Sequence, residues 1–148
     1  MTDNMEFPDT AKCIIRTASS DLGKEELVRK VTELNRNGRV IQLFDPKQIR
    51  SRMHLLGAYL NAVAAFDEKR NTAKSMATEM LLFAGMTCQI NDAIKRMGIK
   101  STKGFLVFAD SERSYSLASG LFKNVKEFKS GKADIAILQK MAVARLGD

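Results

Sequence analysis

The chain has 148 residues, of which 45% are hydrophobic and 28% are charged, as is typical of a globular domain with its own core. Its two cysteines, Cys13 and Cys88, and its single histidine, His54, exclude a disulfide framework and a zinc site built from Cys and His. The formal net charge of +7 favours a polyanionic partner such as RNA, although many basic proteins bind no nucleic acid.

A strand, a helix and a second strand are predicted within the first 44 residues. The apolar residues 13–15 form one strand candidate, and residues 39–44 (RVIQLF) form the other. Between them, apolar residues recur at helical spacing over residues 22–34, after the capping side chains of residues 19–21. Gly38 closes this helix. The order strand, helix, strand indicates an α+β or α/β unit.

The longest predicted helix spans residues 46–69. Asp45 is suited to its N-cap, Pro46 to its first position and Gln48 to the second half of a capping box. A break near Ser51 is an alternative. The predicted core stripe of this helix consists of Ile49, Met53, Leu56, Leu60 and Val63. The basic residues off this stripe are expected at the surface, namely Arg50, Arg52, Lys69 and Arg70.

Residues 73–99 contain two short amphipathic helical patterns that predict a hairpin. The core face of the first pattern consists of Met76, Met80 and Phe83, and that of the second of Ile90, Ala93, Ile94 and Met97. Gly85 and Gly98 are predicted to end the two helices in a left-handed conformation. On periodicity alone, this hairpin is part of the core.

The last third of the chain begins with its clearest strand pattern. Residues 104–109 (GFLVFA) are nearly all apolar, which predicts a central strand. Residues 110–112 cap a helix that reaches about Leu121, and residues 122–128 fit either a strand or a loop. A final helix is predicted over residues 133–146, with an inward face of Ile135, Leu138, Met141, Ala142 and Leu146.

Together these elements predict a single domain over residues 1–148 of the α+β class. Its small, mainly antiparallel sheet of three to five strands is expected to pack with five to seven helices. The N-terminal residues lack the basic and apolar regions of a signal peptide, and the longest apolar run, residues 80–86, is too short to cross a bilayer. We therefore expect a soluble, cytoplasmic protein.

Motifs for catalysis are missing from the sequence. It contains no GxGxxG or GxxxxGK(S/T) phosphate-binding loop, no GxSxG elbow and no HExxH. Glu79 is the one carboxylate inside an apolar helical pattern, and a catalytic role for it requires a second acid or base. A hydrolase or transferase that uses Glu79 or Cys88 is the enzyme alternative, and it requires a deep pocket around one of them. We predict no catalytic residue, no metal and no cofactor.

Residues 54–98 carry a distinctive combination of residues. The run begins with His54, Leu55, Leu56 and Ala58 and continues with Ser75, Glu79, Leu81, Leu82, Gly85, Gln89, Ile90, Ala93 and Gly98. This combination resembles the TPRKB family, the small subunit of the KEOPS complex that binds the PRPK-type atypical kinase. The length near 150 residues, the strand–helix–strand opening and the aliphatic C-terminal helix agree with that family.

The resemblance implies a non-catalytic subunit. Family members join a complex that helps to install threonylcarbamoyl on the adenosine beside the anticodon of tRNAs that read codons beginning with A. They bind the N-terminal lobe of the kinase subunit and stimulate it, and they help to hold tRNA through its 3′ CCA end. The alternative is a protein-interaction module that regulates a kinase without direct RNA binding.

Two sets of residues are predicted to form the interfaces. The RNA site is expected to be bordered, through phosphate contacts and stacking, by Arg50, Arg52, His54, Arg70, Lys74 and Gln89. The kinase contact is expected at apolar residues left near the surface, namely Met97, Ile99 and Met141. For His54 two interpretations remain, a hydrogen-bonded helix residue or a partly exposed ring that stacks on a base.

Overall fold

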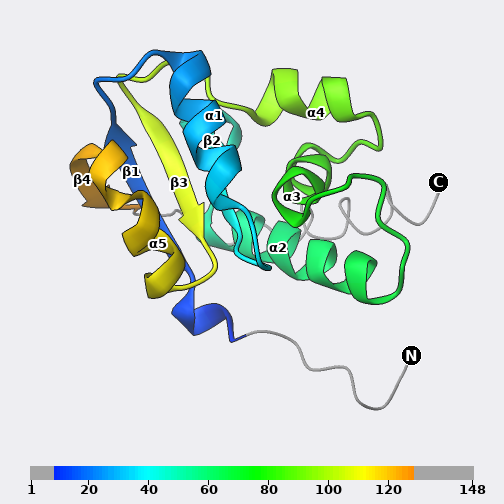
Figure 1. Ribbon diagram of the computed structural model, residues 1–148. Coiled ribbons are helices and arrows are strands. Elements are labelled where there is room, and N and C mark those ends of the chain that lie inside the picture. The colour runs from blue at the N-terminus through cyan, green and yellow to red at the C-terminus, as the bar shows by residue number, and fades with distance from the viewer. Residues whose placement is uncertain (1–8, 129–148) are drawn as a thin grey trace.

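The computed structural model describes residues 9–128, which form five α-helices, three short 3₁₀ turns and four strands (Figure 1). In chain order the elements are η1 (Thr10–Lys12), β1 (Ile14–Ser19), α1 (Lys24–Leu34), β2 (Ile41–Phe44), η2 (Pro46–Gln48), α2 (Arg52–Asp67), α3 (Met76–Gly85), α4 (Ile90–Met97), β3 (Phe105–Ala109), α5 (Glu112–Ala118), η3 (Ser119–Leu121) and β4 (Lys123–Glu127). The predicted α+β class is confirmed. The predicted final helix over residues 133–146, and Met141 with it, lies outside the described residues.

The four strands form one antiparallel sheet in the order β2-β3-β1-β4. All five residues of β3 are buried, because the strand has a neighbour on each side and helices on both faces. The prediction of a central strand at residues 104–109 is therefore confirmed. Residues 122–128, for which strand and loop were both open, contain the exposed edge strand β4. Strand β2 forms the other edge of the sheet.

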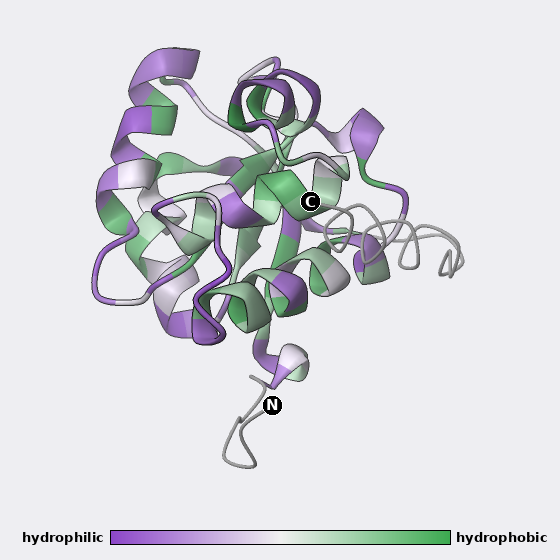
Figure 2. Ribbon diagram, turned by 90° about the vertical axis from the view of Figure 1, so that its right-hand side faces the viewer, coloured by the Kyte–Doolittle hydropathy of each residue, from purple (hydrophilic) through white to green (hydrophobic). Residues whose placement is uncertain are grey.

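Each face of the sheet is covered by its own set of helices (Figure 1). Leu106 and Phe108 of β3 point to the face that packs against α2, α3 and α4. Phe105 and Val107 point to the opposite face, where α1 and α5 cover them. In Figure 2, hydrophobic residues (green) and hydrophilic residues (purple) alternate along the helices. This alternation is expected of helices that have one buried and one exposed side. The protein therefore has three layers around two hydrophobic cores.

The segment after β2 differs from the predicted single helix over residues 46–69. Asp45 does act as an N-cap, but only of the 3₁₀ turn η2, where its side chain accepts a hydrogen bond from the Lys47 N–H. The backbone is extended at Ile49, and Ser51 caps α2 by accepting a hydrogen bond from the His54 N–H. The alternative of a break near Ser51 is confirmed, so Arg50 precedes α2.

The buried face of α2 also differs from the predicted stripe. Met53 is 42% exposed, and Ile49 is buried but lies before the helix. The buried residues of α2 are His54, Leu55, Leu56, Ala58, Tyr59, Ala62 and Ala65. Apolar residues surround most of this helix, so two different stripes at helical spacing could each have formed its buried face. The stripe that is buried contains several alanines, whose small side chains allow close packing against α3.

The two glycines of the α3–α4 hairpin do not take the predicted left-handed conformation. Met86 takes it instead, at φ 55°, and ends α3. Gly98 has a φ of −70° and is required for space, because a Cβ there would lie 2.5 Å from the Ile94 carbonyl oxygen. At Gly85 a Cβ would lie 3.0 Å from the side chain of Met97. Gly85 therefore permits the close approach of α3 and α4, whereas Gly98 gives the chain room to leave the last turn of α4.

Candidate functional site

His54 lies in the core and connects the start of α2 to the end of α3. Its side chain is 3% exposed, and its Nδ1 accepts a hydrogen bond from the Arg50 N–H at 3.2 Å. Since a neutral imidazole has one acceptor and one donor, Nε2 carries the proton and donates to the Ala84 carbonyl at 2.9 Å. A buried ring cannot stack on a base, so the interpretation of His54 as a hydrogen-bonded helix residue is correct and that of a partly exposed ring is wrong.

The predicted basic residues form two separate groups. The contact of His54 with Ala84 places the end of α3 beside the start of α2, so the two helices are antiparallel. Arg50 and Arg52 therefore lie at one end of α2, whose 16 residues are about 24 Å long, and Arg70 and Lys74 lie beyond its other end. These four basic residues therefore do not form one compact patch, which a tRNA site built from all of them would require.

These basic side chains differ in how far they are already engaged. Arg52 is half-buried and donates from Nη2 to the Cys13 carbonyl at 3.1 Å. Arg70 pairs with Glu68 at 2.5 Å, and Lys74 is exposed. Gln89 is exposed at the N-cap of α4, where its side chain makes no capping hydrogen bond. Apart from His54, the members of the predicted RNA set reach the surface at least in part.

Both predicted kinase contacts within the described residues are buried. Met97 packs against Gly85, and its carbonyl accepts a hydrogen bond from the Asp45 N–H at 2.9 Å. Ile99 belongs to the core that α1 and α5 cover. The prediction that these two side chains are left near the surface is wrong, because the end of α4 turns inward and pairs with the chain after β2. Met141 lies outside residues 9–128.

Glu79 is a fully buried carboxylate that organises the turn between α2 and α3. Its oxygens accept hydrogen bonds from the Thr72 N–H at 3.1 and 3.2 Å and from the Ala73 N–H at 2.8 Å. The turn that they fix carries Arg70 and Lys74. The backbone donors of Thr72 and Ala73 help to satisfy this buried acid, and through them Glu79 holds the turn in place.

Two ionisable side chains are buried in the core that α2, α3 and α4 cover, and burial favours their neutral forms. Burial raises the pKa of the Cys13 thiol from 9.0 to about 11, and the nearby carboxylate of Asp110 adds to the rise. Burial raises the pKa of the Tyr59 hydroxyl from 10.0 to about 12, again with a contribution from Asp110. Cys13 is therefore an inert core thiol, whereas Cys88 is partly exposed.

We expect the free energy of unfolding to fall as the pH rises from about 9 to about 12. In this range Cys13 and Tyr59 ionise at lower pH in the unfolded chain than in the native protein, so the unfolded state binds fewer protons and alkali favours it. Urea unfolding at pH 8 and pH 11 measures the fall. A Cys13→Ala/Tyr59→Phe variant should show a smaller fall, and an equal one would refute the assignment.

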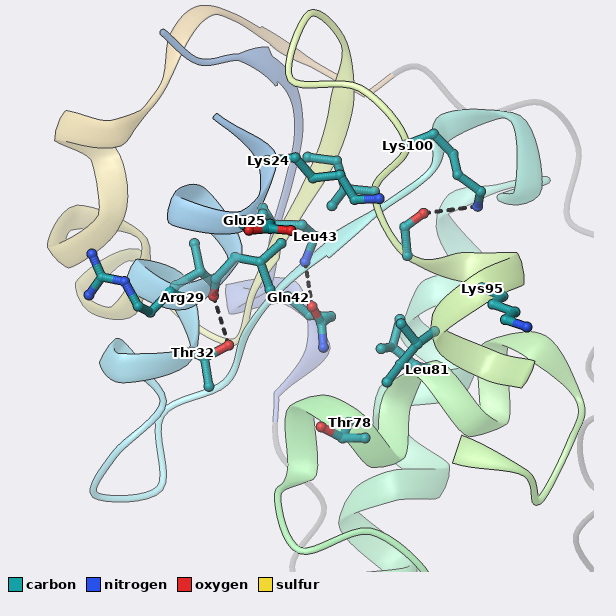
Figure 3. A pocket seen from close by; sticks show the side chains of 15 residues that line it. Lys24, Glu25, Arg29, Thr32, Gln42, Leu43, Thr78, Leu81, Lys95 and Lys100 are labelled. Atoms are coloured by element: carbon teal, nitrogen blue, oxygen red, sulfur yellow. Dashed lines mark hydrogen bonds between the residues drawn. The ribbon is translucent and has the colours of Figure 1, made fainter. Parts of the chain in front are cut away.

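A cavity of about 700 Å³ opens between α1 and α4 beside the edge strand β2 (Figure 3). Val31, Leu43, Leu81 and Ile99 form its buried floor. Figure 3 shows Lys24 and Glu25 of α1 on one side and Leu81 of α3 and Lys95 of α4 on the other. We call this cavity the α1–α4 groove. Neither Glu79 nor Cys88 lines it, so the enzyme alternative gains no support from it.

The sequence interpretation missed the groove because it assigned the apolar residues of both walls to the core. Val28 of α1 is 39% exposed and Ile94 of α4 is 50% exposed. Each stands next to a fully buried apolar residue, Leu27 and Ala93 respectively. Two adjacent apolar residues make the apolar stripe of a helix wider than contact with one core requires. These pairs were the sequence feature that could have indicated a second apolar surface on α1 and α4.

Metal and membrane chemistry receive no support from the described part of the chain. Within residues 9–128, no group of three or more His, Cys, Asp or Glu side chains is arranged to hold a metal ion. None of the helices in the same residues has the length and apolarity that a membrane crossing requires. The surface features of residues 9–128 described above are the α1–α4 groove and the two basic groups around α2.

Comparison with known proteins assigns the family. A comparison with curated proteins finds no match. Residues 20–143, which include every described helix and strand except η1 and β1, match the profile of the family described as Kinase binding protein CGI-121. The match covers most of the chain, agrees with the resemblance to the TPRKB family and supports a kinase-binding role. The chain belongs to the CGI-121 family of kinase-binding proteins.

Proposed function

We propose that this protein is a non-catalytic subunit of a KEOPS complex that modifies tRNA with threonylcarbamoyladenosine. In this proposal it binds and stimulates the PRPK-type kinase subunit in the cytoplasm and helps to recruit tRNA through the 3′ CCA end. The observation that carries the proposal is the family match over residues 20–143, because that family binds a kinase. The net charge of +7 supports the tRNA part of the proposal.

The basic group at the start of α2 is our first candidate for the tRNA contact. Arg50 is exposed, and Arg52 is held in place by the Cys13 carbonyl. His54 contributes indirectly, because its Nδ1 accepts the hydrogen bond from the Arg50 N–H and so fixes the backbone that carries both arginines. Guanidinium groups on a fixed backbone suit phosphate contacts, which supply most of the affinity for RNA.

Reversing both arginines tests this assignment. An Arg50→Glu/Arg52→Glu variant should bind tRNA at least about tenfold more weakly and with a shallower salt dependence, because two phosphate contacts are lost. A gel shift at several salt concentrations measures both effects. The matched control is Lys103→Glu/Lys126→Glu, which reverses two exposed lysines elsewhere. Unchanged binding by the arginine variant at low salt would refute the assignment.

The second candidate function is a module that regulates the kinase without binding RNA. The separation of the two basic groups along α2 and the burial of His54 favour it, since both reduce the size of any single RNA site. A gel shift with intact tRNA and with tRNA that lacks its CCA end separates the two functions. Loss of binding on trimming favours the KEOPS role, and failure to bind either RNA favours the regulatory module.

A further inference from the structure

The two walls of the α1–α4 groove each carry an exposed large hydrophobic side chain. Five large hydrophobic side chains are exposed among residues 9–128, namely Val28, Met53, Ile94, Leu117 and Val125. Val28 and Ile94 face the same groove from different helices, above a buried floor that includes Leu43 and Leu81. Exposed apolar side chains that gather around a concave apolar floor are typical of an interaction site.

The rim of the groove is basic. Among the described residues, its basic lining consists of Lys24, Arg29, Lys95 and Lys100, against one acidic side chain, Glu25. Arg29 is paired with Glu33 at 2.8 Å, and Lys100 lies 3.5 Å from Asp45. The side chains of Lys24 and Lys95 are exposed on opposite sides of the opening (Figure 3). An occupant with an apolar face and acidic flanks is therefore complementary to the groove in both shape and charge.

The strand at the floor is closed to the addition of another strand. The Ile41 N–H donates to the Asn35 side chain, whose amide in turn donates to the Ile41 carbonyl. The Leu43 N–H donates to the Gln42 side chain at 2.8 Å, and the Asp45 N–H donates to the Met97 carbonyl. Because these outward-facing N–H groups are engaged, an occupant is recognised through its side chains, as a helix in a groove is.

The chemistry of the lining favours a protein over RNA. Unpaired bases are recognised by stacking on aromatic side chains, and none of the described residues that line the groove is aromatic. From these observations we infer that the α1–α4 groove receives an acidic amphipathic helix of the kinase that this protein binds. Apolar residues of that helix cover Val28, Ile94 and the floor, and its acidic residues face Lys24 and Lys95. This inference rests on the kinase-binding role.

The test measures the affinity of wild-type protein and wall variants for the purified PRPK-type kinase by calorimetry. Ile94→Glu should weaken binding at least about tenfold, because it places a carboxylate at an apolar wall of an acidic partner's site. Val28→Glu does the same from the other wall. The matched control is Leu117→Glu, since Leu117 is 49% exposed on α5, outside the groove, and this change should leave affinity within about twofold.

Charge reversal separates the acidic from the apolar part of the inference. Lys24→Glu/Lys95→Glu should weaken binding and flatten its dependence on salt, because the rim no longer attracts an acidic helix. Hydrogen exchange of the wild-type complex should show protection in α1 and α4. Thermal unfolding of each variant establishes that it is folded before its affinity is interpreted.

Each other outcome overturns a different statement. Full kinase affinity in both Ile94→Glu and Val28→Glu overturns the groove inference and leaves kinase binding intact. A wild-type protein that does not bind the kinase overturns the kinase-binding role itself. Loss of tRNA binding in Ile94→Glu with unchanged kinase affinity also overturns the inference, because the groove is then an RNA site. An unchanged salt dependence in the lysine variant overturns the acidic character of the occupant.

Discussion

Replacing Glu79 with alanine is expected to lower the free energy of unfolding by about 2–4 kcal/mol. The carboxylate is fully buried and accepts hydrogen bonds from the N–H groups of Thr72 and Ala73. Alanine offers no acceptor, so the buried Ala73 N–H loses its partner and a cavity replaces the carboxylate. Urea unfolding monitored by circular dichroism measures the change.

The conservative variant distinguishes the hydrogen bonds from the volume of the side chain. Glu79→Gln keeps one acceptor oxygen and nearly the same shape, so it should be destabilised by less than the alanine variant. The turn fixed by Glu79 also carries Arg70 and Lys74, and hydrogen exchange at residues 70–75 should accelerate in Glu79→Ala. Equal stability of wild type and Glu79→Ala would show that the carboxylate does not hold this turn.

Local sequence was sufficient to predict the helices and strands whose burial pattern is simple, with both faces buried or with one regular apolar face. Strand β3 reads FLVFA without alternation, because helices cover both of its faces, and such a run indicates a central strand without any knowledge of its partners. Helix α1 was predicted over residues 22–34 and spans Lys24–Leu34, since its apolar residues repeat at helical spacing. Together with the other predicted strands and helices, these two elements led to the predicted α+β class.

Local sequence could not decide between competing signals in the segment before α2. Asp45 with Pro46 and Ser51 with Arg52 are both suited to begin a helix. The decision comes from a distant contact, because the Asp45 N–H donates to the Met97 carbonyl after a separation of more than fifty residues. That hydrogen bond ties the short turn η2 to the end of α4, and the helix begins only at the second cap.

The candidate sites were harder to predict than the fold, because residue type does not show which face of an element finds a partner. Met97 and Ile94 lie on the same short helix and are both aliphatic in character, yet Met97 is buried and Ile94 is half-exposed at the groove. Only the packing of α4 against α3 and Gly85 distinguishes them. The predicted basic residues do reach the surface at least in part. The distance between the pair Arg50 and Arg52 and the pair Arg70 and Lys74, however, is set by the length of α2 and its antiparallel packing with α3.

Replacing His54 with alanine should lower the free energy of unfolding by about 2–4 kcal/mol, because it removes a buried ring and two of its hydrogen bonds. The ring joins α2 to α3 through the Ala84 carbonyl, so the loss should appear in global urea unfolding rather than in local fraying. His54→Gln retains a donor for Ala84 and His54→Asn retains an acceptor for the Arg50 N–H, so each should recover part of the stability.

The same variants test whether His54 acts on RNA directly. At a temperature where His54→Asn is fully folded, its affinity for tRNA should equal that of the wild-type protein, because a buried ring has no surface to offer a base and this variant keeps an acceptor for the Arg50 N–H. His54→Gln lacks that acceptor, so its binding reports how far the backbone before α2 loosens. A fully folded His54→Asn protein with tenfold weaker tRNA binding would instead show that the ring leaves the core to meet the RNA. The expected equality limits the role of His54 to holding the start of α2, where Arg50 and Arg52 reach the surface.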